Sequence, residues 1–119
     1  MIQFLDVSEE NTIAARVVGK IETEDVEKAA KEIDRRLEED GKVNMYIELD
    51  HFEGYEPKAF LEELKLTTEH FGDFRKMAIV SQEEWLNTLA EITDKISPQL
   101  EARYYRLEER PQALRWLEE

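Results

Sequence analysis

The chain has 119 residues, a length that accommodates one hydrophobic core, so we expect a single domain over residues 1–119. Hydrophobic residues make up 41% of the sequence, too large a share for a chain that stays disordered. The formal net charge of -13 repels the phosphates of nucleic acids and of anionic membranes, and we expect neither as a partner.

Two absences in the sequence bear on location. The chain contains no cysteine, which excludes disulfides, thiolate metal sites and cysteine nucleophiles and fits a reducing compartment. No apolar run approaches the roughly 18 residues that cross a bilayer. The first six residues lack the basic flank and apolar stretch of a signal peptide. We therefore predict a cytoplasmic protein without membrane insertion.

The first part of the chain predicts a β-hairpin followed by a helix. Residues 2–7 and 12–19 are rich in apolar and β-branched residues and are separated by a polar turn, which is typical of a hairpin. Thr23 is a suitable cap for the helix, whose apolar residues then recur at helical spacing. Gly41 is a natural end for it.

The middle of the chain predicts two buried strands around a helix. Residues 43–49 form a short apolar run that ends at Asp50, as in a strand covered on at least one face. Pro57 is well placed to open a helix that ends near Gly72. Residues 76–80 form the next strand.

The last part predicts helix, strand and helix. Ser81 and Glu84 have the spacing of a capping box at the start of a third helix. Residues 100–107 alternate like a strand, and Pro111 opens a final helix. The predicted order is β-β-α-β-α-β-α-β-α, an α/β fold with a mixed, mostly parallel sheet of about five strands and about four helices.

Several segments are similar to a known family. They are Gly-Lys-Ile at 19–21, Glu-Leu-Asp-His-Phe-Glu-Gly-Tyr at 48–55, Glu-His-Phe-Gly-Asp-Phe-Arg-Lys-Met-Ala-Ile-Val at 69–80, Trp85, and Ala-Leu-Arg-Trp-Leu at 113–117. Together they resemble the SpoIIAA-like branch of the STAS superfamily, whose fold is also compared with the CRAL-TRIO lipid-binding fold. The resemblance implies a STAS-like domain over nearly the whole chain.

The phosphorylation switch of this superfamily is not carried over. In the anti-sigma antagonists, the switch is a serine at the start of the helix that follows the central strand. Here no serine or threonine occurs between Asp50 and Phe60. Glu56 places a carboxylate near that helix start, where it either mimics a phosphorylated switch or is an ordinary acid at the positive end of the helix dipole.

The carboxyl ends of the predicted parallel strands are the expected place for a site, because ligands of open α/β sheets bind there. The candidates are Asp50, His51, Phe52, Glu53, Tyr55 and Glu56, with Ser81 and Trp85 as secondary candidates. Phe52 and Tyr55 have two interpretations: they anchor a protein partner or line an apolar pocket, or the loop folds over them as a hydrophobic staple.

No catalytic constellation is recognisable. Asp50, His51 and Glu53 are suitable acid–base groups or metal ligands, but their spacing does not bring three ligands together. Ser81 lacks the glycines of a hydrolase nucleophile elbow, and the four glycines are too scattered for a phosphate loop. His70 is expected at the carboxyl end of the second helix in a structural role. We expect no catalytic residue, metal or cofactor.

The leading hypothesis is a non-catalytic regulatory or protein-interaction domain whose partner is an unidentified protein. The alternative is a carrier of a small apolar or lipid-like ligand, based on the CRAL-TRIO comparison and on the wide apolar faces of the second and third helices. An enzyme using Asp50, His51 and Glu53 is a third hypothesis. A homodimer formed through a sheet edge or a helix face is compatible with so small a chain.

Overall fold

The computed structural model describes residues 1–7, 10–93 and 100–119. The turn predicted around Ser8 lies outside the described residues, as do Ser97 and Pro98, where the sequence predicts the end of the third helix. The elements are β1 (Ile2–Leu5), β2 (Thr12–Lys20), α1 (Thr23–Glu39), β3 (Asn44–Glu53), α2 (Pro57–Thr67), the 3₁₀ turn η1 (Phe71–Asp73), β4 (Lys76–Ser81), α3 (Glu83–Thr93), β5 (Glu101–Arg106), the 3₁₀ turn η2 (Leu107–Glu109) and α4 (Arg110–Glu118).

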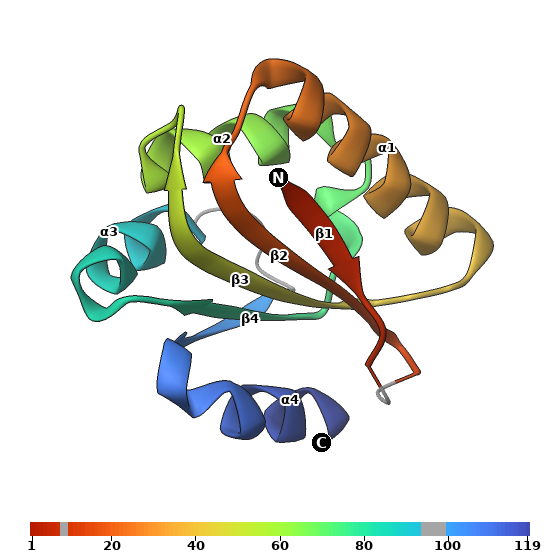
Figure 1. The fold of residues 1–119 in the computed structure, drawn as a ribbon. Helices are drawn as coiled ribbons and strands as arrows, with labels where there is room; N and C mark the ends of the chain where they lie inside the picture. Colours follow the sequence, from red (N-terminus) through yellow and green to blue (C-terminus); the bar gives the residue numbers. More distant parts are fainter. Residues whose placement is uncertain (8–9, 94–99) are drawn as a thin grey trace.

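The strands form one sheet in the order β1-β2-β3-β4-β5, with β3 at its centre. β1 is antiparallel to β2, and the other three neighbouring pairs are parallel. The connections through α1, α2 and α3 all step across the sheet in the same direction, so these helices cover one face, while α4 lies on the other (Figure 1). The predicted α/β fold with a mixed, five-stranded sheet and four helices is confirmed.

The core has two layers that share β3. Alternate residues of this strand point to opposite faces, so Ile47 and Leu49 pack under α1, α2 and α3, whereas Tyr46 packs against α4. Coverage on both faces explains why the strand reads as a nearly continuous apolar run. In the parts of the chain that the structure describes, no helix has both the length and the apolar character needed to span a membrane.

Two helix boundaries differ from the sequence prediction. The cap of α1 is Glu22 and not Thr23, because the Asp25 carboxylate accepts a hydrogen bond of 2.8 Å from the Glu22 amide. α2 ends at Thr67 and not near Gly72, because Thr68 leaves the helical conformation and its hydroxyl donates to the Leu64 carbonyl at 2.6 Å. The aromatic residue that appeared to continue the helix, Phe71, begins η1 instead.

β3 is longer than predicted. Asp50–Glu53, which the sequence indicated as the beginning of a loop, are the last residues of this strand. Their neighbour is the end of β2, where Gly19 pairs with Phe52 and Lys20 pairs with Glu53. The sequence did not indicate a strand here, because residues 50–53 are largely polar. They are also less buried than residues 44–49.

Gly54 fixes the exit of the chain from β3. Its φ angle is +104°, a conformation that L side chains rarely adopt. The preceding carbonyl, of Glu53, accepts a hydrogen bond of 2.8 Å from the Ile21 amide. A Cβ atom at position 54 would lie 2.1 Å from the Ile21 carbonyl oxygen. The close approach of two backbone segments therefore requires glycine here.

We predict that Gly54→Ala lowers the free energy of unfolding by about 3 kcal/mol, because the new methyl group forces two backbone segments apart and the φ angle is unfavourable. The matched control is Gly41→Ala, where φ is +66° but no atom lies within 4 Å of the added Cβ. Its cost should be about 1 kcal/mol. Urea denaturation of both variants measures the difference, and equal losses would contradict the proposed backbone contact.

Candidate functional site

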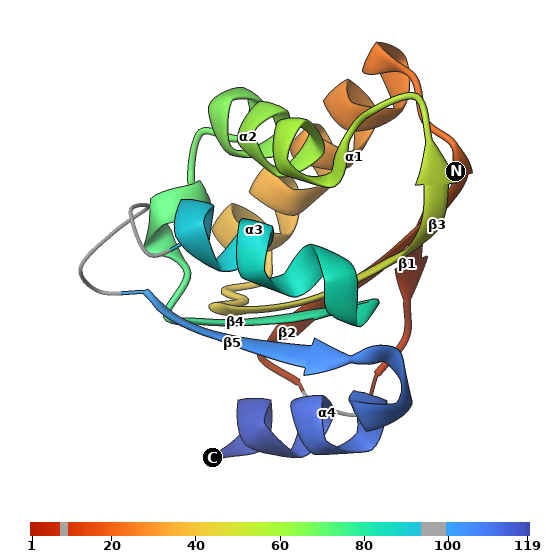
Figure 2. The ribbon, with the colours of Figure 1, turned by 90° about the vertical axis from the view of Figure 1, so that its left-hand side faces the viewer.

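The carboxyl end of the sheet is uneven, because β4 leaves it before β3 does. The last pair between these strands is Leu49 with Ser81, whereas β3 stays paired with β2 as far as Glu53. Figure 2 shows the end of β3 rising away from β4 and β5. Among the described strands, residues 50–53 therefore have a neighbour on the β2 side only. We refer to residues 50–56 as the β3 rim.

A β-bulge in β3 sets the direction of the rim side chains. Val17 pairs with Leu49 and Gly19 with Phe52, so two residues of β3, Asp50 and His51, lie opposite Val18 alone. Without the extra residue, the side chain at position 52 would point away from the core layer that holds Leu49. With it, Phe52 packs against that same layer.

Two side chains satisfy backbone groups where the β4 ladder stops. The Ser81 hydroxyl donates to the Leu49 carbonyl at 2.8 Å, and the His51 amide donates to an Asp50 carboxylate oxygen at 2.8 Å. The first bond replaces a ladder contact that β4 no longer supplies, and the second gives the amide within the bulge a partner. β4 can therefore end here while the Leu49 carbonyl and the His51 amide both keep a hydrogen-bond partner.

Ser81 is not the helix cap that its spacing to Glu84 indicated. It is the last residue of β4 and is completely buried, while α3 begins at Glu83 and the Trp85 amide donates to the Gln82 carbonyl. Its hydroxyl donates to the Leu49 carbonyl inside the sheet, and the residue directly before α3 is Gln82.

The rim aromatics join the two predicted segments. The Phe52 ring lies 5.2 Å from the Trp85 ring and 5.5 Å from the Phe60 ring, measured between centroids. Tyr55 packs edge-on to Phe60 at 6.3 Å, and its hydroxyl lies 3.1 Å from the Thr23 hydroxyl. Phe52 and Tyr55 are half-buried against the core, which is the arrangement expected of a hydrophobic staple. Trp85 adds a half-buried indole to the same place.

Most of the polar rim residues are exposed, and Asp50 is half-buried. The His51 side chain is 86% exposed, and Glu53 and Glu56 are also exposed. Glu56 is the N-cap residue of α2 but makes no side-chain hydrogen bond to the described part of that helix. Between His51 and Asp50 the side-chain contact is 4.0 Å long. Asp50, His51 and Glu53 thus form an acidic surface with one imidazole and do not form a set of convergent ligands.

Across the described residues, one other group brings histidine and acidic side chains together, namely Glu38, Glu69 and His70. These are side chains of the kinds that can hold a divalent cation. Both imidazole nitrogens already have carboxylate partners: Nε2 contacts Glu38, and Nδ1 lies 3.2 Å from Asp73. The Glu38 carboxylate is the main cause of a raised pKa for His70.

His70 therefore has a different structural role from the one predicted. It was expected at the carboxyl end of the second helix, but α2 ends at Thr67 and the imidazole contacts α1 instead. The Asp34 carboxylate accepts hydrogen bonds from the Glu69 and His70 amides at 3.1 and 3.0 Å. These contacts attach the turn after α2 to α1.

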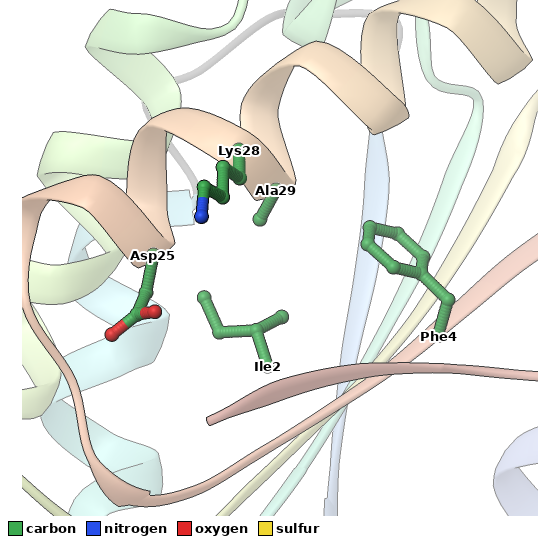
Figure 3. A pocket seen from close by; sticks show the side chains of 5 residues that line it. All are labelled: Ile2, Phe4, Asp25, Lys28 and Ala29. Carbon is green, nitrogen blue, oxygen red and sulfur yellow. The ribbon is translucent and has the colours of Figure 1, made fainter.

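Three shallow cavities accompany these features. One of about 200 Å³ adjoins the rim and is lined by Glu56, Pro57, Lys58 and Trp85. A second, of about 240 Å³, is lined by Gly19, His51, Phe52 and Glu53. A third, of about 130 Å³, lies between β1 and α1 and is lined by Ile2, Phe4, Asp25, Lys28 and Ala29 (Figure 3). Each is smaller than the roughly 300 Å³ at which pockets for drug-sized ligands begin.

Glu48 is the buried charged residue that the sequence analysis missed. It lies in the middle of β3 with 2% of its side chain exposed. Its carboxylate accepts hydrogen bonds from Arg16 Nε at 2.6 Å, Arg110 Nε at 2.7 Å and the Tyr46 hydroxyl at 2.5 Å. Because Arg110 is the first residue of α4, this network attaches that helix to β2 and β3 just below the rim.

The electrostatics of Glu48 follow from these partners. Burial raises the pKa of its carboxyl group, but the hydrogen bonds from Arg16, Tyr46 and Arg110 outweigh burial and hold the pKa below its ordinary value. Burial and the neighbouring carboxylate raise the pKa of Tyr46. A single glutamate within the apolar run 45–49 was the available signal, since a carboxylate in a strand covered on both faces requires partners.

Comparisons with known proteins agree with this architecture. A profile of the SpoIIAA-like family matches residues 12–118. The crystal structure of an uncharacterized protein of the DUF3478 family with a SpoIIAA-like fold, from Shewanella loihica PV-4, is similar with a TM-score of 0.67 and 23% sequence identity, covering 98% of this chain and 92% of that one. Similarity at this identity establishes the fold alone. No curated protein matches the chain.

We predict that Glu48→Ala lowers the free energy of unfolding by about 2 to 3 kcal/mol, because two guanidinium groups lose their shared partner. This loss of stability is at or below the low end of the range for breaking a fully buried ion pair, because both arginines are more than one third exposed and can be rehydrated. Glu48→Gln is the matched control, because it retains the shape and a hydrogen-bond acceptor but not the charge.

The same residue gives a pH dependence with a defined sign. The folded-state pKa of Glu48 is lowered from its ordinary value of 4.5, so its stabilisation is complete above that value and is lost as the pH falls through the folded pKa. Stability of the parent should therefore fall more steeply on acidification than that of Glu48→Gln. Parallel urea midpoints for the two proteins across this pH range would contradict the network.

Proposed function

Because this chain belongs to the SpoIIAA-like family, we propose that it is a non-catalytic regulatory or interaction domain whose β3 rim binds a protein partner. The observation that carries the proposal is the contact between Phe52 and Trp85, with ring centroids 5.2 Å apart. This contact joins the carboxyl end of β3 to the start of α3, so that the two form one continuous surface at the carboxyl edge of the sheet. Binding surfaces of open α/β folds lie at this edge.

The chemistry of the rim favours a basic partner with one apolar anchor. Glu53 and Glu56 present exposed carboxylates on a chain whose net charge is already -13. The cavity of about 200 Å³ beside Trp85 has room for one apolar side chain, and Pro57 supplies part of its wall. A central apolar anchor with a charged periphery is the usual composition of a protein–protein interface.

The proposed regulation does not use phosphorylation at the start of α2. The N-cap position of that helix is Glu56, and the first helical residues are Pro57, Lys58 and Ala59. The carboxylate of Glu56 gives this position a constant negative charge. A partner that recognises the charge would bind without a modifying enzyme.

The apolar-carrier alternative has weaker support. The cavity between β1 and α1 has an apolar floor formed by Ile2 and Phe4, with Asp25 and Lys28 at its margin (Figure 3). Its volume of about 130 Å³ is far below that of known ligand pockets. Protein binding is therefore the proposed function, and a homodimer and a cytoplasmic location stay predictions.

We predict that the double variant Glu53→Lys/Glu56→Lys recovers roughly tenfold less of its partner than the parent, because both charge reversals oppose a basic surface. The measurement is quantitative mass spectrometry after affinity capture from the native cell extract. Glu62→Lys is the matched control, since Glu62 is an exposed acid on the same helix and lies beyond the rim. Equal recovery by all three proteins, or no specific partner at all, would refute the proposed rim.

A further inference from the structure

We infer that the free edge of β3 at Asp50–Glu53 binds an extended, lysine- or arginine-bearing peptide, which joins the sheet as an added strand. The inference rests on the proposed function and names the chemistry of the partner. It starts from the early departure of β4, whose last pair with β3 is at Leu49, while β3 itself continues to Glu53. The resulting edge of four residues is about 13 Å long.

Backbone geometry leaves hydrogen-bonding groups available on this edge. Past Leu49, β2 is the strand that stays paired with β3, and among the described residues no strand pairs with the other side of residues 50–53. The His51 amide has no strand partner, because it lies in the bulge and donates to the adjacent Asp50 carboxylate. A backbone carbonyl of an incoming peptide can replace Asp50 as the acceptor for this amide, as in other cases of strand addition.

Asp50 has two roles in this arrangement. Without a partner, its carboxylate occupies the His51 amide, and a charged group on an exposed edge is a common protection against unspecific pairing. With a partner strand in place, the released carboxylate faces the incoming side chains. The exchange favours a cationic peptide, because the freed charge then gains an opposite charge.

The charges around the edge also favour a basic peptide. The carboxylates of Asp50, Glu53 and Glu56 outnumber the two nearby ammonium groups, of Lys58 beside the Trp85 cavity and of Lys20 opposite Glu53 on β2. A second copy of this chain, pairing through the same edge, would bring like charges opposite each other, which destabilises a strand pair. A peptide with alternating basic residues meets opposite charges instead.

The test uses a hexapeptide of alternating lysine and valine, added to the uniformly ¹⁵N-labelled protein. Amide resonances of residues 50–53 should shift in a saturable manner, while those of β1, the edge strand at the far side of the sheet, should not. A hexapeptide of alternating glutamate and valine should bind roughly tenfold more weakly or not at all. Unmoved rim resonances at millimolar lysine peptide would overturn the inference.

A pair of variants separates strand addition from general charge attraction. His51→Pro removes the edge amide, whereas His51→Ala keeps it and removes only an exposed side chain. The proline variant should bind the lysine peptide roughly tenfold more weakly than the alanine variant. If His51→Pro does not fold, N-methylation of the peptide amides removes the complementary hydrogen bonds, which an added strand donates to carbonyl groups of β3, and should weaken binding roughly tenfold as well.

The outcomes distinguish this inference from the proposed function. A cellular partner that is lost by Glu53→Lys/Glu56→Lys but is bound equally by His51→Pro and His51→Ala would leave the rim as a binding surface and overturn strand addition. If the lysine peptide requires the His51 amide but no cellular partner depends on the rim charges, the edge binds peptides as inferred and the proposed function fails.

Discussion

The structure depends on one mismatch in length: β4 leaves the sheet at Ser81, and β3 continues to Glu53. The mismatch is sustained because the Ser81 hydroxyl and the Asp50 carboxylate satisfy the backbone groups that would otherwise lose their partners. It opens one side of the central strand at the edge of the sheet where α/β folds bind their partners. Both the proposed interface and the inferred strand addition follow from it.

The rest of the fold holds the end of β3 in place. The bulge at Asp50 and His51 turns Phe52 toward the core, where Phe60 and Trp85 pack against it. On the opposite face, Glu48 attaches β3 to β2 and α4 through two arginines. The rim thus presents exposed charges above an aromatic and ionic base.

The fold was predictable from the sequence because apolar periodicity and turn residues define nearly every element. The central position of residues 43–49 followed from their apolar run. The rim was less predictable, since a bulge breaks the alternation that identifies a strand and the residues 50–53 are largely polar. Ser81 and Glu84 show the same limit: their spacing matches a capping box, but tertiary packing uses the serine within the sheet.

The most direct test of the account is the register of β2 on β3 in a nuclear Overhauser spectrum. The bulge predicts backbone contacts between Val17 and Leu49 and, after the extra residue, between Gly19 and Phe52. It also predicts contacts between the Phe52 ring and the Trp85 indole. Contacts of Gly19 with His51 instead, and a Phe52 ring without contacts to Trp85, would contradict the account.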